Sequence, residues 1–269
     1  MSVTVLLITL FIVPCAAMAA AWLVAERSGN SGWADTIWSF SVGATGLIAA
    51  FAPVGSHAVF ERQVMVAGLA GLWSLRLGFH ILGRTLRGTD DPRYAQLRRE
   101  WGSKAKTRMF WFLQIQAVVA FVLALSILVA AHNPQPWGRL QDGLGVMVLI
   151  VAIFGEAVAD RQLARFRRDP ANSGKVCDVG LWGLTRHPNY FFEWLGWVAY
   201  PVIALDMSGT YGWGFIALAG PVLMYWLLVH ASGIPPTEAH MLRSRGAAFL
   251  AYQRRVNAFW PGPSSTKPR

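Results

Sequence analysis

The sequence predicts an all-α, polytopic membrane protein with seven transmembrane helices. Three observations lead to this class. Hydrophobic residues make up 54% of the 269 residues and charged residues only 14%, whereas a soluble domain carries about 25% charged residues. The apolar residues also fall into runs long enough to cross a bilayer, where an α-helix satisfies its own backbone hydrogen bonds.

Seven apolar runs follow one another, and we expect them to form a single integral membrane domain over residues 1–269, with N-terminal spans in 1–131 and a C-terminal half in 140–261. No basic residue precedes the first run, so we expect a retained helix rather than a cleaved signal peptide. Gly43 and Gly46 lie inside the second run and are expected to pack helices together. The expected spans are 3–25, 33–51, 59–82, 109–131, 140–163, 190–205 and 212–230.

Polar segments separate these runs. The segment 83–108 is expected to be a long loop with a surface helix, and 161–187 is a second long polar loop. Residues 237–255 are predicted to form a cytosolic helix with Thr237 as its N-cap, followed by a loose tail from 261. Breaks rich in Pro and Gly are expected at 52–56, 133–136 and 232–236.

The formal net charge of +10 has a topological explanation. Basic residues concentrate in 83–108, in 161–187 and in the C-terminal segment, which seven spans place on one side of the membrane. The positive-inside rule then predicts an external N-terminus and a cytosolic C-terminus. Nucleic acid is not needed as a partner, and no disulfide is expected between Cys15, in a span, and Cys177, in a loop.

Residues 174–193 contain the densest set of chemically capable side chains in this apolar sequence. Pro188 keeps His187 out of helical geometry and can open the helix that follows. The free backbone N–H groups of such a helix start favour an anion. The alternative interpretation of this segment is a basic loop between two membrane helices. The chemically capable side chains of 174–193 are Lys175, Asp178, Arg186, His187, Asn189, Tyr190 and Glu193.

A histidine in the third span is a candidate proton donor. Arg76, His80 and Arg84 are spaced by four and therefore share one helix face. His80 suits proton donation because its unperturbed pKa lies near 6.5; the alternative is a polar clamp between helices. Asp35 opens the second span, either as an acid favoured by the helix dipole or as a second group in the cavity of His80.

Glu156 and Asp160 also share a helix face. Two carboxylates suit a metal or acid–base chemistry, but Arg161, Arg165 and Arg167 can instead neutralise them, and hydrogen bonds to a ribose or an amide are a third option. No Gly-x-Gly-x-x-Gly or Walker motif occurs in a suitable place. The six histidines show no zinc-ligand spacing, so no metal site is expected.

Several of these motifs resemble the steroid 5-alpha-reductase family, in its bacterial branch of membrane proteins. The strongest match is Gly-Lys-Val-Cys-Asp-Val-Gly-Leu-Trp, from 174, with Thr-Arg-His-Pro-Asn-Tyr-Phe-Phe-Glu, from 185. Ser-Gly-Ile-Pro-Pro-Thr-Glu from 232, the later Tyr252 and Leu-Trp-Ser-Leu-Arg-Leu from 72 add to it. The resemblance implies a seven-helix bundle with cytosolic cofactor-binding loops for NADPH, and hydride transfer to a C=C bond conjugated to a ketone.

The resemblance also implies roles for individual residues. His80 falls where the steroid enzymes have a tyrosine that helps to protonate the substrate, and Asp35 falls near their Gln-Glu pair. Both are departures, so the expected substrate is a steroid or another apolar enone that enters from the lipid. The residues implied to bind NADPH or to close its pocket are Asp160, Arg167, Lys175, Arg186, His187, Asn189, Tyr190, Glu193, Glu238 and Tyr252.

Two other functions remain open at this point. Membrane methyltransferases of the isoprenylcysteine carboxyl and phospholipid type also carry an Arg-His-Pro-x-Tyr turn and bind S-adenosylmethionine. Asn189, Glu193 and the basic residues that suit a phosphate favour NADPH over that cofactor. The third possibility is a non-enzymatic protein that binds membrane lipids, which predicts no tight nucleotide site.

Overall fold

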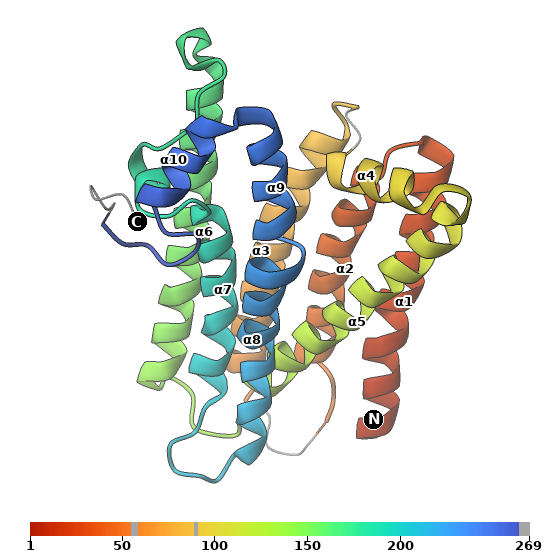
Figure 1. Ribbon diagram of the computed structural model, residues 1–269. Helices are drawn as coiled ribbons and strands as arrows, with labels where there is room; N and C mark the ends of the chain where they lie inside the picture. The colour runs from red at the N-terminus through yellow and green to blue at the C-terminus, as the bar shows by residue number, and fades with distance from the viewer. Residues whose placement is uncertain (55–58, 89–90, 264–269) are drawn as a thin grey trace. The chain divides into compact units, whose positions relative to one another are not determined.

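The computed structural model describes residues 1–54, 59–88 and 91–263, and within these ranges the chain is helical without a strand (Figure 1). The expected break at 52–56 and the expected tail from 261 lie partly outside the described residues. The helices are α1 (Val3–Ser28), α2 (Gly32–Ala50), α3 (Phe60–Thr85), α4 (Pro92–Trp101), α5 (Ala105–Ala131), α6 (Leu140–Arg168), α7 (Pro188–Ala204), α8 (Ala219–Trp226), α9 (Ile234–Arg245) and α10 (Ala247–Arg255).

Five helical segments in the described chain are long and apolar enough to cross a membrane. These helices are consistent with an integral membrane protein. They expose large apolar side chains, which lipid accommodates and water solvates poorly. The helices α2 and α7, of 19 and 17 residues, are not among the five, so the expected count of seven spans is not demonstrated. The five are Val3–Ser28, Phe60–Thr85, Arg93–Ala131, Leu140–Arg168 and Gly212–Arg245.

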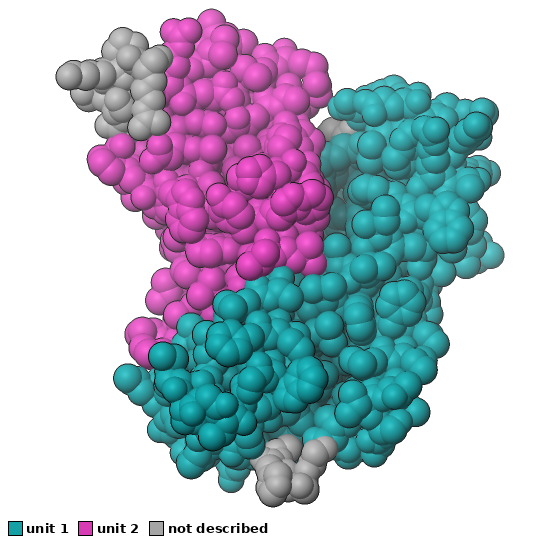
Figure 2. All heavy atoms as spheres, turned by 60° about the horizontal axis from the view of Figure 1, so that its bottom comes forward, with its two compact units in different colours: residues 1–143, 200–220 teal, residues 144–199, 221–269 magenta. Residues whose placement is uncertain are grey.

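The chain divides into two compact units, coloured separately in Figure 2. Unit 1 comprises residues 1–143 and 200–220, and unit 2 comprises residues 144–199 and 221–269. In unit 1, α2 packs against α1, α3 and α5. A side chain at Gly43 would collide with Ser74 of α3, and one at Gly46 would collide with Ile127 of α5. The predicted role of these glycines in helix packing is confirmed.

A buried arginine joins the ends of two helices in unit 1. Arg62, at the start of α3, is 0% exposed, and its guanidinium binds both carboxylate oxygens of Asp142 at 3.0 and 2.9 Å. It also donates to the backbone oxygens of Asn133, Gln135 and Pro136 at 2.6 to 2.8 Å. The charge is therefore paired and fully hydrogen-bonded, as a buried cation requires.

In unit 2, α6 and α7 approach closely where glycine removes a side chain. Phe192 fills the space over Gly155, and Leu149 lies against Gly196. The segment after α10 folds back onto the start of α7: Arg186 N donates to Asn257 O at 2.9 Å, and Gly262 N donates to Leu184 O at 3.0 Å. The first residues of the expected loose tail are therefore docked.

The expected helix 237–255 is wrong in its start and in its continuity. Gly233 caps α9, which begins at Ile234, and the two prolines that follow lie in its first turn, where a missing N–H is harmless. Thr237 lies inside α9, and its hydroxyl contacts the Tyr190 hydroxyl at 3.2 Å. Gly246, with φ +49°, ends α9 and begins a second helix, α10.

Candidate functional site

The segment that leads into α7 is held by the C-terminal chain of unit 2. Thr185 donates from its hydroxyl to the backbone oxygens of Ala258 and Phe259 at 3.1 and 3.0 Å, and it accepts from His187 N at 3.3 Å. Pro188 opens α7, as predicted. The backbone N–H groups of Asn189 and Tyr190, in the first turn, therefore have no intrahelical acceptor.

Four side chains beside this turn form a cluster that we call the Glu238 cluster: Arg186, His187, Glu238 and Gln253. Arg186 donates to the Glu238 carboxylate from Nε at 2.7 Å and from Nη2 at 3.3 Å. Gln253 Nε2 donates to Oε2 of the same carboxylate at 2.6 Å. The remaining Arg186 nitrogen donates to the backbone oxygens of Gln253 and Val256. These bonds tie α9 and the end of α10 to the predicted cofactor turn.

His187 is buried within this cluster. Its Nε2 lies 3.0 Å from Glu238 Oε1, and its ring stacks on that of Tyr190, with centroids 5.2 Å apart and planes at 4°. Burial lowers the pKa of His187 even though the Glu238 carboxylate acts in the opposite direction. The neutral imidazole therefore donates from Nε2 to Glu238 near neutral pH.

Tyr252 has a structural partner on the other side of the turn. Its hydroxyl donates to the backbone oxygen of Trp182, whose indole N–H donates to Ala159 O on α6 at 3.0 Å. Burial raises the pKa of Tyr252, so the phenol stays protonated. In the same region Gln162 accepts from Leu181 N at 2.9 Å. Tyr252 thus links α10 through the 180–183 turn to α6.

Asn189 is the predicted cofactor residue with an unused acceptor. Its Oδ1 is buried and has no hydrogen-bond partner among the residues that the structure describes. Two predicted cofactor residues of the same unit, Arg167 and Lys175, are exposed, and their side chains make no hydrogen bond or ion pair within the described ranges. The buried Glu193 accepts a hydrogen bond from Trp197 Nε1 at 3.1 Å. Asp160, on α6, also interacts with another group of the protein.

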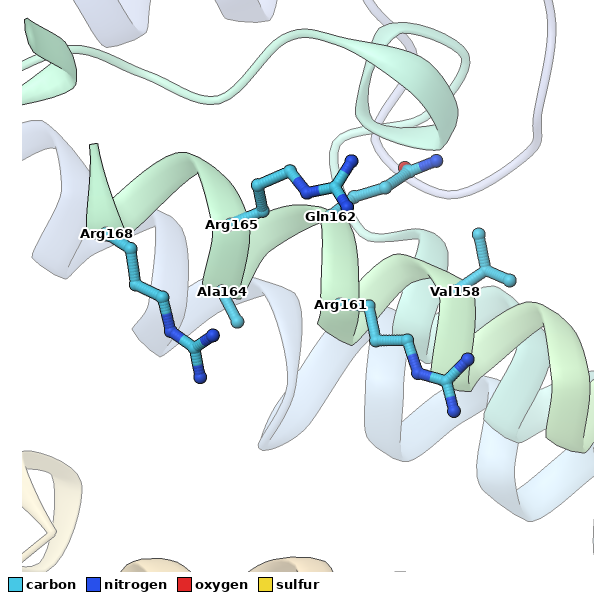
Figure 3. Close-up of a pocket in the computed structure, with 6 residues that line it drawn as sticks. All are labelled: Val158, Arg161, Gln162, Ala164, Arg165 and Arg168. Carbon is cyan, nitrogen blue, oxygen red and sulfur yellow. The ribbon is translucent and has the colours of Figure 1, made fainter.

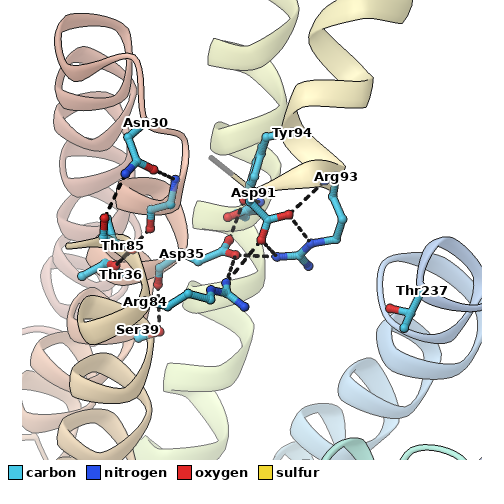
Figure 4. Close-up of polar contacts among 12 residues, drawn as sticks. Asn30, Asp35, Thr36, Ser39, Arg84, Thr85, Asp91, Arg93, Tyr94 and Thr237 are labelled. Atoms are coloured by element: carbon cyan, nitrogen blue, oxygen red, sulfur yellow. Dashed lines mark hydrogen bonds and ion pairs between the residues drawn. The ribbon is translucent and has the colours of Figure 1, made fainter. Parts of the chain in front are cut away.

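The predicted catalytic acid of unit 1, Asp35, belongs to an ion-pair network (Figure 4). Its carboxylate accepts from Arg93 at 2.6 Å and from the Tyr94 hydroxyl at 2.5 Å. Arg84 lies 4.0 Å from it and 3.3 Å from Asp91. Burial opposes ionisation of Asp91, but hydrogen bonds and charge from Arg93 hold the pKa of Asp91 below its ordinary value. Asp35 is therefore a positioned carboxylate with two hydrogen-bond donors, Arg93 and Tyr94, and a second cation, Arg84, nearby.

Sequence reasoning missed Arg93 and Tyr94. The only local signal is Asp91 followed by Pro92, which is an N-cap and first-turn pair: the Asp91 side chain accepts from Arg93 N at 2.9 Å. That pair predicts a helix start but says nothing about Asp35, 59 residues away from Tyr94. The predicted proton donor His80 has an exposed side chain on α3, one helical turn before Arg84.

Comparison with known proteins places the chain in a family. Residues 21–256 match the family described as Protein of unknown function (DUF1295). Over 266 residues the chain is 23% identical to Uncharacterized protein C594.04c of Schizosaccharomyces pombe (strain 972), covering 89% of this chain and 75% of that protein. No solved structure matches the chain. Because the family match spans most of its length, the chain belongs to the DUF1295 family.

Proposed function

We propose that the protein is an NADPH-dependent reductase that transfers hydride to the C=C bond of a hydrophobic enone, as its resemblance to the steroid 5-alpha-reductase family implies. It would act as a seven-span protein of the bacterial inner membrane, with an external N-terminus and a cytosolic C-terminus. The observation that carries the proposal is the buried Oδ1 of Asn189 without a partner among the described residues.

The residues of unit 2 suit the chemistry of this cofactor. A buried carbonyl oxygen without a donor costs free energy, so its retention indicates a ligand that supplies an N–H. The carboxamide of a nicotinamide has such an N–H. The first turn of α7 favours negative charge, and the exposed cations Arg167 and Lys175 suit phosphate groups. We therefore assign cofactor binding to Asn189, Tyr190, Arg167 and Lys175, with the Glu238 cluster keeping the turn in place.

NADPH, when bound, supplies the hydride, and the protein must stabilise the negative charge that develops on the enone oxygen. We assign proton donation to His80, whose Nδ1 or Nε2 would carry the proton to that oxygen. Asp35 is already neutralised by Arg93 and held by Tyr94, so it suits a positioning role better than that of an acid. Apolar side chains exposed on the helices suit a substrate that arrives from the lipid.

The experiment is ligand-dependent thermal stability of the purified full-length protein in detergent, because a ligand that binds only the native state raises its stability. NADPH should raise the melting temperature, and S-adenosylmethionine should not. Lys175→Gln should reduce the NADPH shift, whereas Lys104→Gln, at another exposed lysine, in unit 1, should leave it unchanged. Stabilisation by S-adenosylmethionine alone would favour methyl transfer; no shift with either ligand would favour a non-enzymatic lipid-binding protein.

A further inference from the structure

The helix α6 continues beyond the length that a membrane requires. Its 29 residues correspond to about 43 Å at 1.5 Å per residue, compared with about 30 Å for the hydrocarbon core. The additional turns lie at the C-terminal end, where the sequence changes from apolar to basic after Val158. These turns therefore lie at the level of lipid headgroups when the apolar part spans the bilayer.

The apolar residues before this change and the basic residues after it lie on the same face of α6. Phe154 is 68% exposed and Val158 is 40% exposed. The next residues at alternating spacings of three and four are arginines, which keeps all five on one helix face. We call this face the α6 stripe; it consists of Phe154, Val158, Arg161, Arg165 and Arg168.

The basic part of the stripe borders a hollow of about 360 Å³. Figure 3 shows that Arg161 and Arg168 extend to one side of α6, whereas Arg165 extends to the other side, towards Gln162. Val158 lines one end of the hollow, so that apolar and cationic groups adjoin in a single depression. The lining residues are Val158, Arg161, Gln162, Ala164, Arg165 and Arg168.

The three arginines of the stripe are exposed, and within the described ranges their side chains make no hydrogen bond or ion pair. The acidic residues of α6 do not neutralise them from the same face. Glu156 follows Phe154 by two residues, and Asp160 follows Val158 by two residues. Two residues correspond to a rotation of about 200° around the helix axis, so both carboxylates lie on the face opposite the stripe. The hollow therefore presents three positive charges to its occupant.

We propose that the α6 stripe binds an anionic phospholipid of the surrounding leaflet. The guanidinium groups bind the headgroup phosphate, for which arginine has the matching donor geometry. An acyl chain lies along Val158 and Phe154. Continuity of the stripe with the lipid-facing part of α6 distinguishes this occupant from a water-soluble phosphate, which has no use for the apolar end. The site is separate from Asn189 and does not depend on the proposed reductase activity.

The test uses the full-length protein in an uncharged detergent, titrated with dioctanoyl phosphatidylglycerol or with dioctanoyl phosphatidylcholine. Binding is measured by native mass spectrometry and by the shift in melting temperature, which the 13 tryptophans report by fluorescence. The variant is Arg161→Gln/Arg165→Gln/Arg168→Gln. The control, Arg99→Gln/Lys104→Gln/Arg108→Gln, removes the same charge from exposed positions of unit 1. NADPH and inorganic phosphate form the remaining arms.

We expect phosphatidylglycerol to bind and to stabilise the wild type more than phosphatidylcholine does. Loss of each arginine should weaken binding about fivefold, so that the triple variant binds about 100-fold more weakly. Because these side chains have no protein partners in the described ranges, the variant should fold; Arg161→Gln/Arg168→Gln, expected to weaken binding about 25-fold, gives a milder second measurement. Equal binding of the two lipids, unchanged affinity of the triple variant, an equal loss in the control, or a loss confined to NADPH or inorganic phosphate would overturn the proposal.

Discussion

Replacement of Asn189 by leucine should increase the stability of the ligand-free protein and weaken the binding of the cofactor. The buried Oδ1 has no partner among the described residues, and an unsatisfied buried acceptor costs about 1–3 kcal/mol. Leucine has a similar volume and no acceptor. At the lower end of that range, the melting temperature should rise by about 2–4 °C for a chain of this size.

The same substitution should lower the affinity of the protein for NADPH. Loss of one hydrogen bond of about 1.4 kcal/mol raises the dissociation constant about tenfold. The assay is melting temperature with and without NADPH, followed by tryptophan fluorescence. The ligand-free melting temperature should rise, while the shift that NADPH produces becomes smaller.

Asn133→Leu is the matched control, because that asparagine is 0% exposed and fully used. Its Nδ2 donates to Ile203 O and Ala204 O at 3.0 and 2.9 Å, and its Oδ1 accepts from Gln135 N at 3.1 Å. We expect this variant to melt at a lower temperature. If Asn189→Leu is destabilised as much as Asn133→Leu, then Oδ1 has a partner in the native protein, and the argument for a ligand there fails.

Three further predictions concern other parts of the chain. Arg62→Met should destabilise the protein by about 3–5 kcal/mol, because it leaves Asp142 buried beside lost hydrogen bonds; an unfolding titration in detergent measures this, and a loss below 1 kcal/mol would contradict it. His80→Ala should abolish turnover of an apolar enone while NADPH still raises the melting temperature; loss of that shift would assign His80 to cofactor binding. Since the pKa of His187 is lowered on folding, the unfolded chain binds the extra proton first, so stability is complete above about pH 6.5 and decreases as the pH falls towards the folded pKa. Melting temperatures between pH 7.5 and 5 should show this decrease for the wild type, and a smaller one for His187→Gln.

Much of the helical pattern could be predicted locally. The expected starts at residues 3, 59 and 140 lie within one residue of α1, α3 and α6. Apolar runs of this length form helices whatever they pack against, because backbone hydrogen bonding in a bilayer leaves no alternative. The C-terminal helix was mispredicted because two prolines suit a helix start as well as a stop, and because the positive φ of Gly246 depends on the surrounding fold.

The candidate site divides in the same way. The amino-acid sequence by itself determined that polar side chains concentrate in residues 174–193 of an otherwise apolar protein, and that a helix can begin at Pro188. Only the tertiary structure decided which of those side chains are already occupied. Arg186 and His187 are bound by Glu238, 52 and 51 residues away, and Asp35 is bound by Tyr94, 59 residues away. Asn189, between occupied neighbours, keeps a buried oxygen without a donor among the described residues. Helix periodicity determines which residues share a face, but pairing between distant segments depends on how whole helices pack, and that pairing decides which polar groups are left for a ligand.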